Sequence, residues 1–140
     1  GFESTKVIGS LTVESSSKRS NKNAVIRDSK FENARLDVVC LDEDTTIYVT
    51  RNWFRSLDRA HNLSLKCIAW KSIRCSENLL QSQKFSPIVL GFQEGKHGNL
   101  IYENNTVKSG RHGLRIMELL PRGPVTFANN IFDTVEIQRP

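Results

Sequence analysis

An asparagine recurs along this chain at intervals of 26, 27 and 25 residues, and Ser29 precedes the first of them by 23 residues. Apolar residues keep fixed places around each of these positions, five and three residues before it and two residues after it. A segment of this length cannot bury its apolar side chains alone, whereas stacked copies of it bury a continuous core. The repeat therefore predicts a solenoid. The recurring asparagines are Asn52, Asn78, Asn105 and Asn130.

A second set of apolar pairs keeps a similar spacing between the asparagines. The two residues of each pair are separated by one residue, which is the period of a β-strand and not that of a helix. We therefore predict at least two short strands in each segment, and a further side over residues Cys67–Trp70. The pairs are Leu11 and Val13, Leu36 and Val38, Leu63 and Leu65, Ile88 and Leu90, and Leu114 and Ile116.

Each recurring asparagine stands at a bend between two strands, where Asn tolerates left-handed backbone geometry and hydrogen-bonds backbone groups. Amides stacked at one position of successive coils can bond to one another along the axis. We therefore interpret the series as a structural ladder. The expected fold is all-β, a single right-handed parallel β-helix over residues 11–140, with about five coils of about 25 residues after a lead-in of residues 1–10. Its first and last coils are incomplete, so we expect a longer β-helix or association at the exposed ends.

With these ladders and bends, the segment Ser109–Ile116 resembles the right-handed parallel β-helix of the pectate-lyase-like superfamily. The resemblance implies polysaccharide chemistry. Arg111-His112-Gly113 and Arg115-Ile116-Met117 are similar to the Gly-His-Gly and Arg-Ile-Lys motifs of polygalacturonase-like enzymes, whose acidic motifs have no counterpart here. We also find no pair of carboxylates at outward strand positions with the separation that glycoside hydrolysis requires. We therefore interpret His112 as a turn histidine and Arg115 as a surface arginine, and the alternative is that these two are the catalytic residues.

Aromatic and basic residues at outward or corner positions form the candidate binding patch. Sugars stack on aromatic rings, and most aromatic residues of this chain are predicted to point inward. The alternative is that the outward rings pack under a loop or against another domain. The candidate binding residues are Tyr48, Arg51, Trp53, Arg55, Trp70 and Arg111.

The chain is basic, with a net charge of +5 and a sequence pI of about 9.3. Such a charge suits nucleic acid or acidic glycans, but the cations are spread and Asp42-Glu43-Asp44 interrupts them. A solvated basic surface is the preferred interpretation, and we do not expect nucleic acid as a partner. The three adjacent acids are interpreted as a solvated turn, and a calcium site that uses their oxygen atoms as ligands is the alternative. No other cofactor is expected.

Three cysteines stand at inward positions of the repeat, where cysteine packs as a small apolar residue. Cys40 and Cys67 occupy equivalent places in adjacent coils, and Cys75 shares the place of Val49. We expect buried thiols, with a disulfide between Cys40 and Cys67 as the alternative. No zinc-binding spacing is present.

Three functions remain open at this point. The first is a non-catalytic recognition, adhesion or scaffold module of an extracellular or cell- or virion-surface protein, with a polysaccharide or other glycan as ligand. The second is a fragment of a polysaccharide lyase or glycoside hydrolase, or a phage tailspike-like protein. The third is an intracellular adaptor that binds protein partners. Asn62 and Asn104 begin Asn-x-Ser/Thr sequons, which are glycosylation acceptors only if the chain is secreted by a eukaryote. No membrane span is expected, because no apolar run approaches about 18 residues.

Overall fold

The computed structural model describes the backbone of residues 2–3, 6–7, 10–14, 23–56, 62–82, 88–109, 114–118, 121–132 and 135–137. Its description of side chains covers residues 23–56, 62–82, 88–108 and 121–132. Every regular element in these ranges is a β-strand, and every pair of neighbouring strands is parallel. Among the described residues there is no helix of the length and apolar character that a membrane crossing requires.

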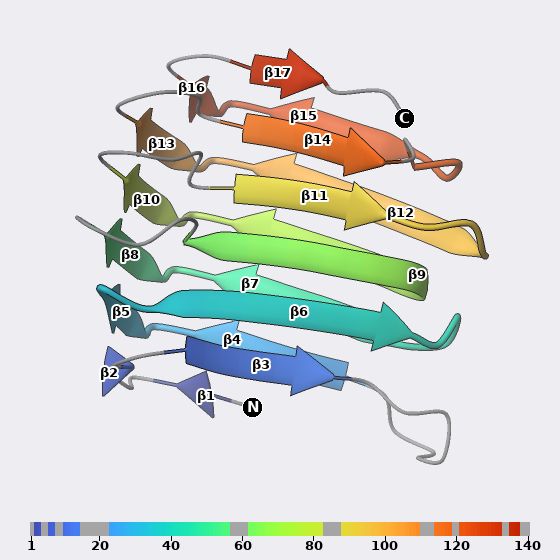
Figure 1. The fold of residues 1–140 in the computed structure, drawn as a ribbon, viewed down its shortest axis with the longest axis horizontal. Coiled ribbons are helices and arrows are strands. Elements are labelled where there is room, and N and C mark those ends of the chain that lie inside the picture. Colours follow the sequence, from blue (N-terminus) through green and yellow to red (C-terminus); the bar gives the residue numbers. More distant parts are fainter. Residues whose placement is uncertain are drawn as a thin grey trace.

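The strands form three sides of a solenoid, each a ladder of parallel strands stacked along one axis (Figure 1). Side 1 consists of β1 (Phe2–Glu3), β4 (Asn23–Arg27), β7 (Thr46–Thr50), the second half of β9 (Leu63–Ser76), β12 (His97–Glu103) and β15 (Val125–Ala128). Side 2 consists of β2 (Lys6–Val7), β5 (Lys30–Glu32), β8 (Trp53–Ser56), β10 (Leu79–Ser82), β13 (Thr106–Ser109) and β16 (Ile131–Phe132). Side 3 consists of β3 (Ser10–Glu14), β6 (Arg35–Leu41), the first half of β9, β11 (Ile88–Phe92), β14 (Leu114–Glu118) and β17 (Val135–Ile137).

The register of these ladders is the one that the repeat predicts. On side 2, Phe31 pairs with Phe54, Phe54 with Leu80, and Leu80 with Val107. On side 3, Leu36 pairs with Leu63 and Leu63 with Ile88. The prediction of an all-β parallel β-helix is therefore confirmed.

The number of turns is lower than the sequence suggested. The fold amounts to about three turns, not five. Three successive turns, β4–β6, β7–β9 and β9–β11, have described side chains on all three sides. The prediction was too high because the apolar pattern also runs through the strands on either side of these turns, whose side chains are described only in part.

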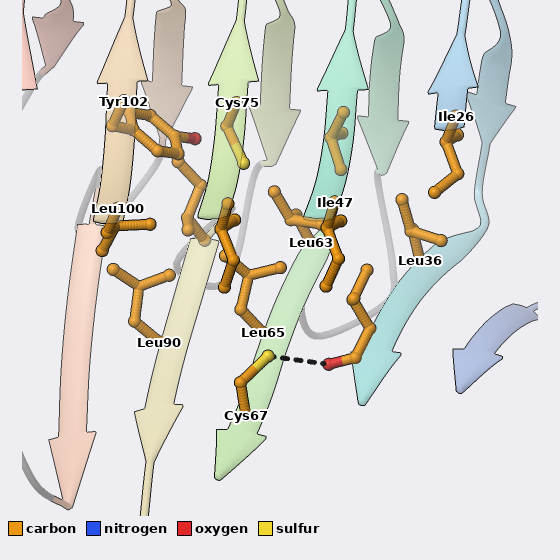
Figure 2. Close-up of a cluster of buried hydrophobic side chains, with 14 of the residues drawn as sticks. Ile26, Leu36, Ile47, Leu63, Leu65, Cys67, Cys75, Leu90, Leu100 and Tyr102 are labelled. Atoms are coloured by element: carbon orange, nitrogen blue, oxygen red, sulfur yellow. Dashed lines mark hydrogen bonds between the residues drawn. The ribbon is translucent and has the colours of Figure 1, made fainter. Parts of the chain in front are cut away.

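The core is the interior of the solenoid. There, the inward side chains of each strand pack against the side chains at the equivalent positions of the next strand in the same ladder; we call one level of the stack, with a strand from each side, a rung. Phe31 stacks on Phe54 with ring centroids 4.5 Å apart and an interplanar angle of 13°. Leu63, Leu65 and Leu90 continue the filling on side 3, opposite Cys75 and Tyr102 on side 1 (Figure 2). Close stacking of this kind buries apolar area at each rung and stabilises it by about 25 cal/mol per Å².

The corner between sides 3 and 1 differs from the prediction. β9 runs without interruption from Leu63 to Ser76, so Cys67–Trp70 is not a separate side but the place where the strand crosses from side 3 to side 1. In the pairing with β6, Cys40 faces Cys67 while Leu41 faces Ala69, which leaves one extra residue in β9. Such a bulge bends a strand and increases its twist, which lets one strand serve two sides.

Candidate functional site

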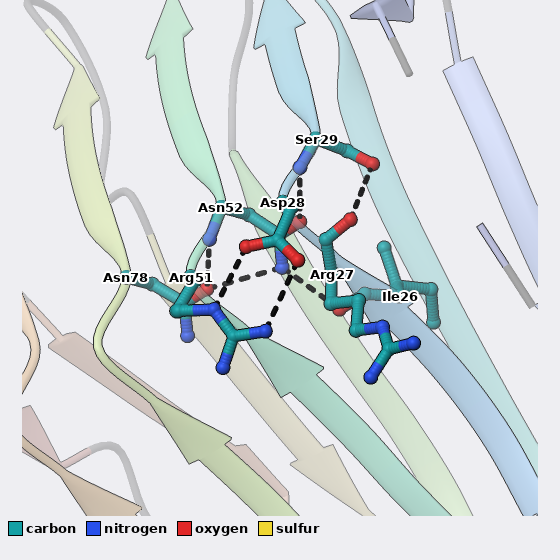
Figure 3. A network of polar contacts seen from close by, with 7 residues as sticks. All are labelled: Ile26, Arg27, Asp28, Ser29, Arg51, Asn52 and Asn78. Atoms are coloured by element: carbon teal, nitrogen blue, oxygen red, sulfur yellow. Dashed lines mark hydrogen bonds and ion pairs between the residues drawn. The ribbon is translucent and has the colours of Figure 1, made fainter. Parts of the chain in front are cut away.

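The asparagine ladder lies at the corner between sides 1 and 2 (Figure 3). The Oδ1 atom of Asn78 accepts hydrogen bonds from the backbone N–H and the Nδ2 of Asn52, at 3.0 and 3.1 Å. Asn105 accepts the same two bonds from Asn78, and Asn130 accepts them from Asn105. Ser29 N–H donates to Asn52 Oδ1 at 3.0 Å. The predicted ladder is confirmed. Each Nδ2 also donates to a backbone carbonyl oxygen, namely that of Ile26, Val49, Cys75 or Tyr102.

The left-handed residue at this corner is the one that precedes each ladder position. The expectation that the ladder asparagine itself has this geometry was wrong. In the left-handed geometry the backbone N–H reaches the next rung, as Arg51 N does when it donates to Ser76 O at 3.0 Å. The residues with positive φ before the ladder positions are Asp28 at 52°, Arg51 at 53°, Glu77 at 56°, Asn104 at 56° and Asn129 at 55°.

Trp53 is the centre of a polar and aromatic cluster on the outer face of side 2. Its indole Nε1 donates to Gln81 Oε1 at 3.1 Å, which ties the ring across to the next rung. The Lys30 ammonium, from the preceding rung, lies 4.3 Å from the ring centroid, within the range of a cation–π interaction. Arg55, two residues beyond Trp53 on the same strand, is exposed. We refer to Lys30, Trp53, Arg55 and Gln81 as the Trp53 platform.

The Trp53 platform combines a half-buried indole with two cations and an amide on a parallel ladder. Lys30 and Trp53 are in register, as are Arg55 and Gln81, so the four residues occupy two adjacent outward columns. Lys30 Nζ also lies 3.9 Å from Glu32 Oε2, and both side chains are partly exposed. An exposed ion pair of this length contributes little to stability, so the ammonium can exchange partners at low cost.

Sequence analysis identified two members of the Trp53 platform and missed the other two. Trp53 and Arg55 were candidates because of residue type. Lys30 lies 23 residues before Trp53, and Gln81 lies 26 residues after Arg55. The repeat alone would have placed them in the same outward columns, so the signal was present in the register.

The structure separates the remaining members of the predicted binding patch. Tyr48 lies on side 1, in register with Val25 and Arg74, and so faces away from side 2. Arg51 lies at the corner and forms a two-point ion pair with Asp28, with Nε–Oδ1 at 2.8 Å and Nη2–Oδ2 at 3.0 Å (Figure 3). The hydrogen bond from Arg51 is the main cause that lowers the pKa of the Asp28 carboxyl.

Trp70 lies at a corner, as expected, but it is buried, with 1% of its surface exposed. Its Nε1 donates to Asn99 O at 3.0 Å, and its ring stacks on His97 with centroids 4.4 Å apart. The His97 ring is itself bridged, since Nδ1 accepts from Arg122 N–H at 3.0 Å and Nε2 lies 2.7 Å from Gln93 O. Trp70 therefore stabilises the corner between sides 3 and 1 and is unavailable to a ligand in solution.

The candidate binding residue Arg111 and the candidate catalytic residue His112 lie outside the described part of the chain. The backbone of Arg115 lies in β14, in register with Val89 and Glu136 on side 3. The backbone of Arg115 therefore belongs to side 3, whereas the Trp53 platform belongs to side 2.

The two sequons differ in exposure. The Asn62 side chain is fully buried, so it is inaccessible as a glycan acceptor in the folded chain, contrary to its candidacy. Asn104 is exposed and has a φ of 56° at the corner that precedes the ladder residue Asn105. Its backbone N–H donates to Ala128 O at 3.0 Å. The amide ladder is formed by the next residue, Asn105, and does not include the Asn104 side chain.

The three cysteines are buried thiols, as predicted, and Cys40 and Cys67 pair in register without a disulfide. Cys67 Sγ donates to Val38 O at 3.9 Å (Figure 2). Burial raises the pKa of the Cys67 thiol far above its usual range, and the neighbouring Cys40 adds to this. Burial also raises the pKa of Cys75 to about 12. Thiols in such surroundings are poor nucleophiles, because the thiolate is the reactive form.

The acidic turn does not gather its three carboxylates. Asp42 Oδ1 accepts from Asp44 N–H at 2.9 Å within the turn, whereas Glu43 Oε2 lies 2.9 Å from Lys96 Nζ. The hydrogen bond that the Lys96 ammonium donates to the Glu43 carboxylate is the main cause that raises the pKa of Lys96. Over the described residues, no group of three or more His, Cys, Asp or Glu side chains is placed to hold a metal ion.

No family model, no curated protein and no solved structure matches this chain.

Proposed function

We propose that the chain is a non-catalytic recognition module of an extracellular or surface protein, in which the solenoid is the scaffold and the Trp53 platform binds an acidic glycan. The observation that carries this proposal is the arrangement of Lys30 and Arg55 around an indole that Gln81 holds in place. An indole face suits the C–H face of a sugar ring. A guanidinium and an ammonium suit its carboxylate or sulfate groups.

Lys30 has a defined part in this binding. Its ammonium lies 4.3 Å from the indole centroid. An acidic sugar at the indole exchanges this cation–π contact for a contact between the ammonium and the acid group. The Lys30 ammonium therefore keeps a favourable electrostatic contact when an acidic sugar binds. A neutral sugar displaces the ammonium from the indole without offering it a new partner. The platform is therefore selective for acidic over neutral glycans.

We favour recognition over hydrolysis because described carboxylates at outward strand positions are paired with cations. Asp37 lies 2.8 Å from Arg35, and Glu103 lies 2.6 Å from Arg74. A carboxylate bound to a cation is not placed to act as the general acid of a glycosidase. A place in the pectate-lyase-like superfamily is part of the same proposal, and the parallel solenoid with its asparagine ladder supports it. The exposed Asn104 sequon is consistent with a secreted chain.

A glycan array that includes uronate, sulfated and neutral polysaccharides tests the proposal. We expect binding to acidic glycans that falls by at least about tenfold in Trp53→Ala, corresponding to ~1.4 kcal/mol, and that is partly retained in Trp53→Phe. Tyr48→Ala on side 1 is the matched control and should bind like the wild type. Circular dichroism verifies that each variant is folded. Absence of any glycan ligand, or equal binding by Trp53→Ala, refutes the proposal, and release of sugars from the array ligands refutes its non-catalytic part.

A further inference from the structure

The outer face of side 2 carries two columns of side chains that run along the solenoid axis beyond the Trp53 platform. They cross three successive strands, β8, β10 and β13 (Figure 1). The residues of both columns alternate with buried residues along each strand, so they point outward. The first column consists of Trp53, Leu79 and Thr106, and the second consists of Arg55, Gln81 and Lys108. We refer to these six residues as the side 2 strip.

The second column places two cations on either side of an amide. Arg55 and Lys108 are exposed, and the half-buried Gln81 lies between them in register with both. Neighbouring parallel strands lie about 4.8 Å apart, so the two cations are separated by two rungs, or about 10 Å. Gln81 Oε1 accepts from the Trp53 indole at 3.1 Å, which leaves the Gln81 Nε2 group as an uncharged donor on the middle rung.

The corner beside the middle rung is negatively charged. Glu77 is exposed there, two residues before Leu79. The equivalent corner positions, each directly before a ladder asparagine, are occupied by Arg51 in the preceding rung and by Asn104 in the following rung. An acid group bound at the middle rung is therefore repelled by the Glu77 carboxylate, and β10 offers it no cation. Acid groups are favoured at the first and third rungs of the side 2 strip and disfavoured at the second.

We propose that the side 2 strip binds an acidic glycan lengthwise along the solenoid axis, with one sugar unit on each rung, and selects chains whose acid groups stand on alternate units. The inference rests on the proposed function, because the first unit occupies the Trp53 platform. A unit of an extended glycan advances the chain by about the spacing between rungs. The acid group of the first unit is then bound by Arg55, an uncharged second unit by Gln81, and the acid group of the third unit by Lys108. The ligand class is a glycan that alternates a uronic acid with an N-acetylated amino sugar.

A glycan that crosses side 2 parallel to the strands has fewer contacts. Only Trp53 and Arg55 of β8 point outward, because Phe54 and Ser56 are buried. At the corner before β8, the Arg51 guanidinium is already bound in a two-point ion pair. A chain in this direction therefore has one exposed cation of β8 for its acid groups, whereas a chain along the axis has two cations at a fixed separation. The axial direction is the one that matches the charges of the strip.

Isothermal titration calorimetry with the disaccharide and the tetrasaccharide of hyaluronan tests the axial arrangement. Hyaluronan has one carboxylate per disaccharide, so only the tetrasaccharide reaches both cations. We expect the tetrasaccharide to bind at least about fivefold more tightly than the disaccharide, equivalent to ~1 kcal/mol. Lys108→Gln should remove this gain and leave binding of the disaccharide unchanged. Lys66→Gln, which removes another exposed lysine from side 3, is the matched control and should bind both oligosaccharides like the wild type.

A galacturonate tetrasaccharide, which has a carboxylate on every unit, tests the selection for alternate acid groups. Net charge alone predicts that the basic chain binds it more tightly than the hyaluronan tetrasaccharide. The side 2 strip predicts the reverse order, by at least about threefold, because the second carboxylate meets Glu77 and no cation. Glu77→Gln should narrow this difference. Tighter binding of the galacturonate by the wild type would overturn the selection.

The same titrations distinguish a failure of this inference from a failure of the proposed function. Suppose that the wild type binds the hyaluronan disaccharide and Trp53→Ala does not. If the affinity then neither rises with length nor depends on Lys108, the axial arrangement is refuted and the Trp53 platform remains a binding site. If Trp53→Ala binds every acidic oligosaccharide like the wild type, or if the wild type binds none of them, the proposed function fails and this inference fails with it.

Discussion

Replacing Asn78 by alanine removes the middle of the asparagine ladder. The Asn78 side chain accepts two hydrogen bonds from Asn52 and donates one to Val49 O at 2.8 Å and one to Asn105 Oδ1 at 3.0 Å. The alanine variant leaves the Asn52 N–H, one Asn52 Nδ2 hydrogen and the Val49 carbonyl without these partners. Both asparagines are buried, so solvent does not replace the lost bonds freely.

The expected cost is large for a single substitution. A buried polar group left without a partner costs about 1–3 kcal/mol. Three such groups, with some relaxation of the corner, give a loss of about 4 kcal/mol in the free energy of unfolding. Domains of this size are stable by about 5–15 kcal/mol, so the variant should be near the limit of folding. Asn99→Ala is the matched control, because the Asn99 side chain is exposed and its carbonyl bond to Trp70 is retained.

Urea unfolding, followed by tryptophan fluorescence and far-ultraviolet circular dichroism, measures this loss. With an m-value of about 2 kcal/mol/M, the midpoint of Asn78→Ala should lie about 2 M below that of the wild type. The midpoint of Asn99→Ala should correspond to a change of no more than about 0.5 kcal/mol. A loss below about 1 kcal/mol in Asn78→Ala would show that the ladder is a by-product of the stacking and not a source of stability.

Three further predictions concern strain, titration and exposure. Glu77→Asn should stabilise the chain by about 0.5–1 kcal/mol, because Glu77 has a φ of 56° and Asn tolerates left-handed geometry better; a lower urea midpoint contradicts this. Burial raises the pKa of Cys75 from 9.0 to about 12, so the folded state favours the neutral thiol. The contribution of the neutral Cys75 thiol to stability is complete below about pH 9 and is lost as the pH rises toward 12. Over this range of pH, the urea midpoint of Cys75→Ala should therefore depend less on pH than that of the wild type. In a eukaryotic secretory host, peptide mapping of the folded product should find glycan at Asn104 and not at the buried Asn62.

The part of the fold that sequence predicts best is the part that repeats. Apolar residues at fixed distances from Asn52, Asn78, Asn105 and Asn130 specify the rungs, because a parallel solenoid places equivalent residues directly above one another. The amide ladder follows from the same register. The left-handed residues do not follow from residue type, since Arg51 and Glu77 adopt that geometry at a cost of roughly 1–2 kcal/mol each. Their geometry is imposed by the bonds of the ladder on either side.

Trp70 shows why alternation alone misplaces a side chain. The inward and outward pattern of β9 holds through Cys67, and then the bulge opposite Cys40 and Leu41 inserts one residue. Trp70 turns into the corner at this point and stacks on His97. Farther along the strand, Ile73 and Cys75 are again buried, at the alternate positions that Cys67 begins. A local bulge of one residue is invisible to a search for period-2 patterns when the alternation resumes beyond it, as it does here at Ile73 and Cys75.

The Trp53 platform was half predictable. Its columns follow from the repeat, which fixes Lys30 beside Trp53 and Gln81 beside Arg55. The bond from the indole to Gln81 and the position of the ammonium over the ring depend on side-chain rotamers, which periodicity does not specify. Tyr48 was assigned to the patch for another reason. It is close to Trp53 along the chain, but proximity along the chain does not show which side of a solenoid a residue occupies.

Amide-proton nuclear Overhauser effects in the labelled chain test the parallel, in-register stacking most directly. The solenoid predicts contacts between backbone protons of residues one repeat apart, such as Phe31 with Phe54, Phe54 with Leu80, and Leu80 with Val107. It also predicts no close pairs of Hα protons across neighbouring strands of the described sides, because such pairs are the signature of antiparallel sheets. Strong cross-strand Hα–Hα effects, or contacts displaced by one residue from these pairs, would contradict the fold.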